Sequence, residues 1–164
     1  MSNTVLKAIW PGQTTNSLME LVDSSACAPA AWAAMRGKYL FRREWASDKE
    51  HLKAIWAIGV LPRHHRAVLA MTSDHAMVLQ KDYKQAAADI RAWLWDFGNP
   101  AGHWKAIASV FDSAPDCPAL GFHLTSTFQD PWALDSIDWS RPWSVYDVLD
   151  KNYPNDTGHK PLRG

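Results

Sequence analysis

The sequence lacks the features that mark secreted, membrane or zinc-ribbon proteins. It has only two cysteines in 164 residues, Cys27 and Cys117, and no Cys-x-x-Cys pair, which excludes a disulfide framework. No apolar run approaches the roughly 20 residues of a membrane-spanning helix, and the first residues show no basic segment followed by an apolar one. We therefore expect a soluble, cytoplasmic protein with no membrane contact.

A charge excess of either sign is also missing. Lys plus Arg and Asp plus Glu number 17 each, so the formal net charge is zero. This balance provides no basic field and argues against nucleic acid as a partner. Apolar residues make up 47% of the chain and charged residues 21%, which predicts one folded domain of ordinary size.

Tryptophan, in contrast, is abundant, with ten residues in the chain. A Trp side chain combines a large apolar surface with one N–H donor, so it is common both in cores and at interface anchors. Two interpretations remain open on this ground alone: a Trp-rich helical core, or a surface that binds a partner.

Helix start and stop signals recur along most of the chain. The predicted helices begin near Thr14 or Thr15, Pro29, Ser47, Pro62, Asp82 and Pro100. Threonine and serine accept hydrogen bonds from free N–H groups at a helix start, and proline is tolerated in a first turn. The first predicted helix follows a lead-in ended by Pro11-Gly12, and the second ends at Gly37.

The range Pro62–Gly98 has the most consistent helix pattern. Apolar residues recur at helical spacing over 68–79, with His75 on the same stripe, and again over 86–97 before Gly98. Asp82 starts an Asp-x-x-Gln cap between the two stripes. We expect two antiparallel neighbouring helices.

The composition changes after residue 128. The segment 129–164 is rich in Trp, Asp and Pro, with a short helix expected near Val145 to Leu149, capped by Ser140. Its last dozen residues have little apolar content and are expected to be flexible. The sequence thus predicts an all-α fold: a single-domain bundle of five to seven helices over 1–128, with an extended C-terminal segment that either folds back or docks on a partner.

The seven histidines do not form a recognisable metal motif. His64 and His75 share a helix face but lie roughly 16 Å apart along its axis. No pair has the spacing of His-Glu-x-x-His, and none lies near a cysteine. We therefore predict no metal site and no cofactor.

One fragment of a catalytic motif is present. His123-Leu124-Thr125 matches the His-x-Thr element of phosphoesterases that need two such elements, and no other histidine here is followed by Thr or Ser at the second position. No Gly-x-Ser-x-Gly elbow or Gly-rich phosphate loop accompanies it. A His-dependent phosphoesterase or hydrolase using His123 and Thr125 remains an alternative function.

The apolar stripes of the predicted helices do not explain the short polar segment Arg63 to Arg66. Together with the acidic-aromatic C-terminal segment, it is the best candidate for a binding surface. The predicted partner-binding residues are Arg63, His64, Arg66, Trp132, Trp139 and Trp143. The expected function is non-enzymatic protein binding, as an adaptor; an immunity protein or phage-encoded inhibitor that blocks a macromolecule would show the same features.

Several short sequence motifs, taken together, resemble those of a known protein family. Over residues 10–131 they are Trp10-Pro11-Gly12 with a Leu-rich stretch to Leu21, Leu61-Pro62-Arg63, Arg66-Ala67-Val68, Ala86-Ala87-Ala88 to Trp93, and Ala119-Leu120-Gly121-Phe122 with Ser126 and a later Pro131. In this order they resemble an uncharacterised bacterial helical family of type VI secretion accessory gene clusters. The chain departs from that family at His64-His65 and at Leu69-Ala70. The resemblance implies an accessory role near effector loading, with no catalytic residues carried over.

Overall fold

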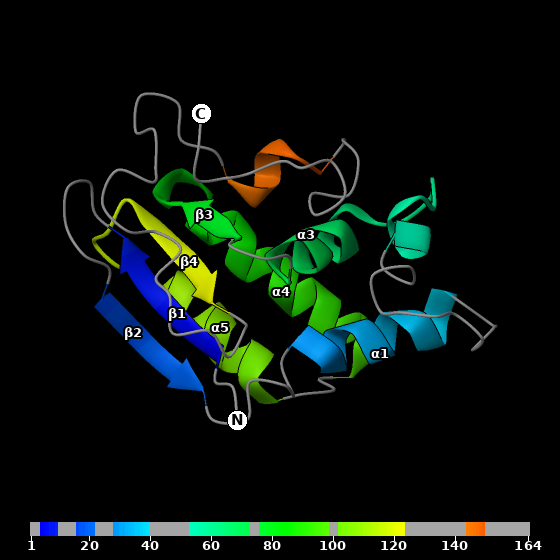
Figure 1. The fold of residues 1–164 in the computed structure, drawn as a ribbon, viewed down its shortest axis with the longest axis horizontal. Helices are drawn as coiled ribbons and strands as arrows, with labels where there is room; N and C mark the ends of the chain where they lie inside the picture. Colours follow the sequence, from blue (N-terminus) through cyan, green and yellow to red (C-terminus); the bar gives the residue numbers. More distant parts are fainter. Residues whose placement is uncertain are drawn as a thin grey trace.

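The structure is a computed structural model that describes residues 4–9, 16–21, 28–39, 53–72, 76–98, 102–123 and 144–149. Most of the regular structure in these ranges is helical, and a small antiparallel sheet lies at one end of the molecule (Figure 1). The mainly helical character is therefore confirmed, whereas the all-α class omitted the sheet. Within the described ranges, every helix is too short or too polar to cross a membrane.

The sheet has four strands in the order β2-β1-β4-β3, and all neighbours are antiparallel. The strands are β1 (Thr4–Ile9), β2 (Asn16–Leu21), β3 (Met77–Leu79) and β4 (Ala119–His123). Leu6 is opposite Phe122, and Met77 is opposite Gly121. The sheet thus joins the beginning of the chain to a segment more than a hundred residues later.

Two helix predictions were wrong where this sheet forms. The helix expected from Thr14 or Thr15 is strand β2, which pairs with β1. The helix expected over 62–79 ends at Met71, and Met77–Leu79 forms β3. In both places pairing to another strand satisfies the backbone hydrogen bonds of a segment that is too short to form a stable helix by itself.

The helices lie beside one another with α4 between α3 and α5 (Figure 1). Their bounds are α1 (Ala28–Tyr39), α3 (Arg63–Met71), α4 (Tyr83–Phe97) and α5 (Gly102–Asp112), with 3-10 turns η2 (Gln80–Asp82) and η3 (Val145–Asp147). Residues 53–56 form a further helical turn. The helices predicted near Pro29, Asp82 and Pro100 are confirmed, and the one near Pro62 is confirmed only as far as Met71. The helix near Pro29 continues beyond Gly37 to Tyr39.

Of the two caps expected for α4, the C-terminal cap forms, and the N-terminal cap lacks its side-chain hydrogen bond. Gly98 ends the helix in the left-handed conformation, at φ 72°, and its N–H donates to the Leu94 carbonyl oxygen. Asp82 occupies the N-cap position, but its side chain accepts no capping hydrogen bond. The helix start predicted near Ser47 lies outside the described residues.

The core is formed by the apolar faces of the helices and by β3 and β4. Its largest fully buried side chains are Trp93, Trp104, Tyr83, Phe111, Met35, Ile55, Leu69 and Met71. The Trp93 and Trp104 rings lie 5.8 Å apart, and the Trp93 indole N–H donates to the Met35 sulfur at 3.3 Å. Trp93 and Trp104, like the buried Trp56, therefore lie in the core, as the first interpretation of the tryptophan content expects.

The C-terminal segment folds back over residues 144–149. Val145 and Leu149 belong to the core, and the Tyr146 hydroxyl donates to Asp89 Oδ2 at 2.7 Å. The predicted cap residue was wrong, because Ser144 caps η3 where Ser140 was expected. Ser144 forms a capping box with Asp147. The flexible ending expected for the last dozen residues lies outside the described ranges.

Candidate functional site

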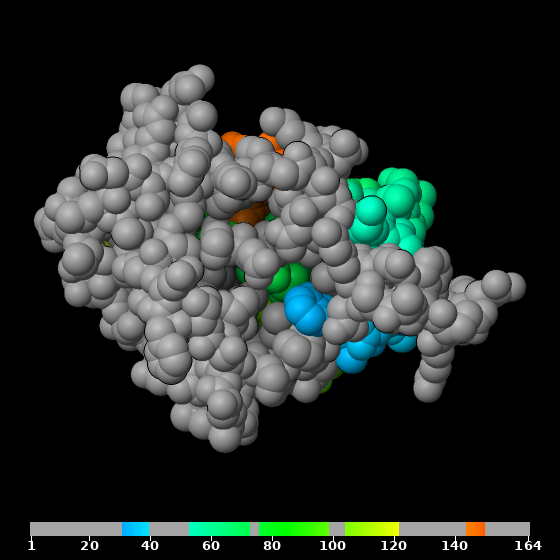
Figure 2. All heavy atoms as spheres, in the orientation of Figure 1, coloured from blue at the N-terminus to red at the C-terminus, as the bar shows by residue number. Residues whose placement is uncertain are grey.

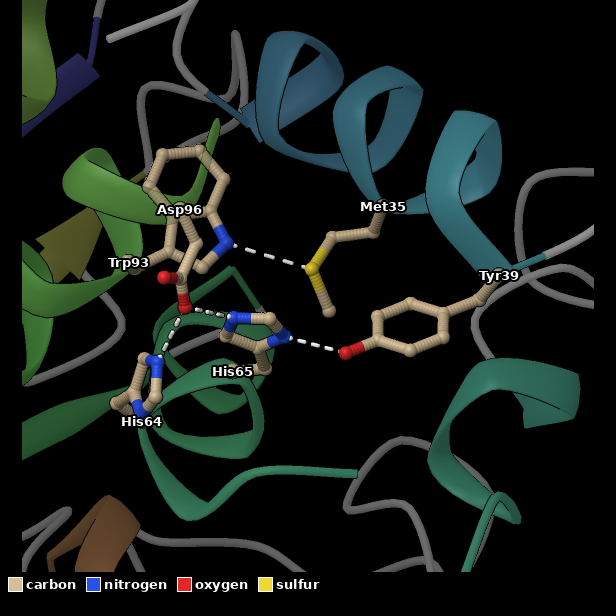
Figure 3. A network of polar contacts seen from close by, with 6 residues as sticks. All are labelled: Met35, Tyr39, His64, His65, Trp93 and Asp96. Carbon is tan, nitrogen blue, oxygen red and sulfur yellow. Dashed lines mark hydrogen bonds and ion pairs between the residues drawn. The ribbon is translucent and has the colours of Figure 1, made fainter. Parts of the chain in front are cut away.

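Four polar side chains from three helices meet in one cluster, which Figure 3 shows. Asp96 Oδ2 lies 2.6 Å from His64 Nε2 and 2.7 Å from His65 Nε2. On the other side of the same ring, His65 Nδ1 lies 2.6 Å from the Tyr39 hydroxyl oxygen. We call these four residues the His–Asp cluster.

The cluster forms because three helix ends converge. His64 and His65 lie in the first turn of α3, Asp96 lies in the last turn of α4, and Tyr39 is the last residue of α1. The first turn of α3 contains no acidic side chain of its own. A helix N-terminus is stabilised by negative charge nearby, and here the Asp96 carboxylate comes to it from another helix.

The electrostatics define where the protons lie. Hydrogen bonds from His64, and then from His65, lower the pKa of Asp96, so it is a carboxylate that only accepts. Each Nε2 therefore carries a hydrogen and donates. Burial lowers the pKa of His65 despite the Asp96 hydrogen bond, which opposes it, so its ring is neutral and Nδ1 accepts the Tyr39 hydroxyl hydrogen.

This chain of hydrogen bonds has the order of a nucleophile, base and acid, but Tyr39 is not an activated nucleophile. Burial, and then the Asp96 charge, raise the pKa of its hydroxyl. Activation requires the opposite shift. The cluster has a second chemical capability: of the described residues, His64, His65 and Asp96 are the only group of three or more metal-binding side chains whose ligand atoms lie within 4.8 Å of one another.

The structure separates the predicted binding residues of α3. His64 joins the His–Asp cluster, and Arg63 is exposed at the first position of the helix. Arg66 is half-buried, lies 5.1 Å from the Trp56 ring centroid and donates to the Ile58 carbonyl oxygen at 2.9 Å. Arg66 therefore holds the segment before α3 against the helix.

The other predicted residues are not brought together in the described ranges. His123 is the last residue of β4, where it is opposite Val5. Thr125 and His75 lie outside the described residues, as do Trp132, Trp139 and Trp143.

Two large apolar side chains are exposed, one in the last turn of α4 and one shortly before α3. Trp95, next to Asp96, is 89% exposed, and Val60, just before α3, is 87% exposed. Figure 2 shows the segment that contains Val60, in turquoise, at the surface of the molecule.

The sequence reasoning missed Tyr39, Asp96 and Trp95, although two signals were present. Asp96 is an acidic residue in the last turn of a helix, where the helix dipole disfavours negative charge. Trp95 lies off the apolar stripe of the same helix. Tyr39 lay beyond the predicted helix end at Gly37, so no sequence signal connected it to His65.

Comparison with known proteins gives no family for this chain. No family model matches it, and neither curated proteins nor solved structures show a match.

Proposed function

We propose that the chain is a non-enzymatic protein-binding protein, an adaptor, and that Trp95 is the anchor of its contact with a partner. The observation that supports this is the 89% exposure of the Trp95 side chain on a well-packed helix. Trp is the residue type most enriched at interface hot spots, where its truncation weakens binding by about 2 kcal/mol or more.

The neighbours of Trp95 favour a rigid anchor. Trp93, on the same helix, is fully buried, Gly98 caps the helix end, and Asp96 ties it to α3. An anchor presented by a fixed helix requires no ordering of the backbone when it binds. The matching partner is a protein with an apolar pocket and one acceptor for the indole N–H.

The exposed Val60 adds apolar surface on the segment that leads into α3. Arg63, also exposed, begins that helix and adds a cation. Arginine is enriched at protein interfaces together with tryptophan. These residues support a protein partner rather than a small substrate.

The biological setting of such an adaptor rests on the resemblance to the secretion accessory family, which favours a partner from a bacterial secretion system. An inhibitor that blocks a macromolecule would use the same surface. No observation in the described residues favours the phosphoesterase alternative, because His123 has no second His-x-Thr element beside it there.

Site-specific photo-crosslinking tests the proposal. A crosslinking amino acid replaces Ala92, a half-buried residue one turn before Trp95 on α4, in one variant and Lys84 in the control, so that Trp95 itself is kept; Lys84 is exposed near the other end of α4. In the native host we expect one defined protein adduct from position 92 and none from position 84. Excess wild-type chain should compete for the adduct, and excess Trp95→Ala chain should not.

The result that would overturn the proposal is equally defined. It is overturned if position 92 gives no adduct, or if Trp95→Ala competes as well as the wild type. An adduct with a second copy of this chain would replace the adaptor by a homo-oligomer. The identity of a specific partner separates an adaptor from an inhibitor: only an inhibitor suppresses its partner's activity.

A further inference from the structure

The His–Asp cluster offers more than a link between helices, because its donor atoms form the ligand set of a metal site. Imidazole nitrogens suit zinc and its neighbours in the first transition row, and sites with three protein ligands keep a fourth position open. We propose that His64, His65 and Asp96 bind one divalent transition-metal ion, with Zn²⁺ as the probe that best fits the donors. This site is independent of the proposed contact through Trp95.

The three ligand groups already lie close together. Both imidazole Nε2 atoms approach the same carboxylate oxygen, at 2.6 and 2.7 Å (Figure 3), and the ligand atoms of the three residues all lie within 4.8 Å of one another. In a tetrahedral zinc site with bonds of about 2.0 Å, ligand atoms lie roughly 3.3 Å apart. Coordination of one ion therefore requires each nitrogen–oxygen contact to lengthen by about 0.6 Å and the two imidazole nitrogens to lie at a similar separation.

Metal binding requires only a change of tautomer at the two rings. Without metal, each Nε2 carries a hydrogen that is donated to Asp96. With metal, each Nε2 lone pair binds the ion, and the hydrogen of the His65 ring moves to Nδ1. The His65 Nδ1–H then donates to the Tyr39 oxygen, which lies 2.6 Å away. A hydroxyl can donate or accept, so Tyr39 serves both states.

Tyr39 thus supplies a feature typical of protein metal sites. A ligating histidine almost always has a hydrogen-bond partner at its other ring nitrogen, which fixes the tautomer and the orientation of the ring. The His65 ring is further held by Phe97, at a centroid distance of 4.9 Å, and its side chain is only 2% exposed. One ligand is therefore fixed in place before the ion arrives.

The other two ligands give the ion a path from solvent. The side chain of His64 is 27% exposed and that of Asp96 is 33% exposed. Lys38 is the cation that acts on His65 from α1, and its charge weakens the attraction for a divalent ion. No zinc motif is recognisable along the chain because the ligands are adjacent histidines on one helix and a carboxylate on another.

Isothermal titration of Zn²⁺ into the chelator-treated full chain tests the site. We expect one ion per chain for the wild type and for His103→Gln, which removes a histidine on α5, a helix that carries none of the four cluster residues. His64→Gln and Asp96→Asn should bind at least about tenfold more weakly. Circular dichroism confirms that each variant is folded; if Asp96→Asn does not fold, His64→Gln decides.

Two further measurements separate coordination at this site from binding elsewhere. Tyr39→Phe keeps all three ligands and should weaken zinc binding about tenfold while the stoichiometry stays at one. Co²⁺ should give visible absorption bands in the wild type that His64→Gln loses.

The proposal is overturned if the wild type binds no zinc, or if His64→Gln and Asp96→Asn bind it as tightly as the wild type. The cluster would then serve only to connect α3 with α4. Trp95→Ala should bind zinc normally, so failure of the metal site and failure of the protein contact are distinguishable.

Discussion

The His65 ring and the Asp96 carboxylate join the first turn of α3 to the last turn of α4 through a 2.7 Å hydrogen bond. The ring is buried, whereas the carboxylate reaches solvent. A buried polar ring is tolerated only when its nitrogens are hydrogen-bonded, and both are. This link therefore contributes to stability as well as to the candidate site.

Removing the buried ring should destabilise the protein. His65→Ala leaves a cavity and takes the acceptor away from the Tyr39 hydroxyl, so we expect a loss of about 3 kcal/mol in the free energy of unfolding. His64→Ala, at the exposed side, should lose less than about 1 kcal/mol. Urea denaturation in the presence of a chelator measures both; equal losses would contradict the different burial of the two rings.

The metal-free protein should become less stable in mild acid. Burial lowers the pKa of His65, so between that pKa and the ordinary value near 6.5 the unfolded chain binds a proton that the folded chain does not. Stability therefore rises with pH through this window.

The lowered pKa of Asp96 acts in the same direction at lower pH. Its contribution is present above the ordinary carboxyl pKa and is lost as the pH falls through the folded value. NMR titration of the histidine ring protons measures the pKa of His65 in the folded protein. A value at or above 6.5 would contradict the predicted loss of stability in mild acid.

Two tryptophans on α4 should separate stability from binding. Trp93 is fully buried, so Trp93→Ala should lose about 3–5 kcal/mol of stability. Trp95 is exposed, so Trp95→Ala should change stability by no more than about 0.5 kcal/mol. Thermal or urea unfolding of the two variants measures this contrast. A large loss in Trp95→Ala would show that its ring packs on the body of the protein.

The cap of α4 offers a backbone test. Gly98 has φ 72°, and a Cβ added there meets no atom within 4 Å, so Gly98→Ala should lose about 1–2 kcal/mol through backbone strain alone. Gly59→Ala is the matched control, because its Cβ also meets nothing and its φ is not in the left-handed region. Urea midpoints that shift equally for both variants would exclude the strain.

Local signals in the sequence predicted the structure correctly where it depends on a single helix. Gly98 ended a helix as predicted, and Trp93 and Phe97 lay on its packed face. Strand β3 was missed because its partner β4 lies far along the chain, and β2 was missed because its conformation depends on pairing with the preceding strand β1. Pairing with another strand overrides local propensity, and a single sequence does not display it.

Only half of the candidate site could be predicted from the sequence, for the same reason. His64 and His65 stood out because no apolar stripe explained them. Their partners Asp96 and Tyr39 belong to other helices, and only the packing of three helix ends connects them. Arg66 also stood out, yet the structure shows it covering Trp56, which no spacing rule indicates.

The affinity of the captured partner for wild-type and Trp95→Ala chains tests the central claim most directly. If Trp95 is the anchor, its truncation should weaken binding by about 30-fold or more, the equivalent of about 2 kcal/mol, while the fold and the zinc stoichiometry remain unchanged. Equal affinities of the two chains for that partner would contradict the account.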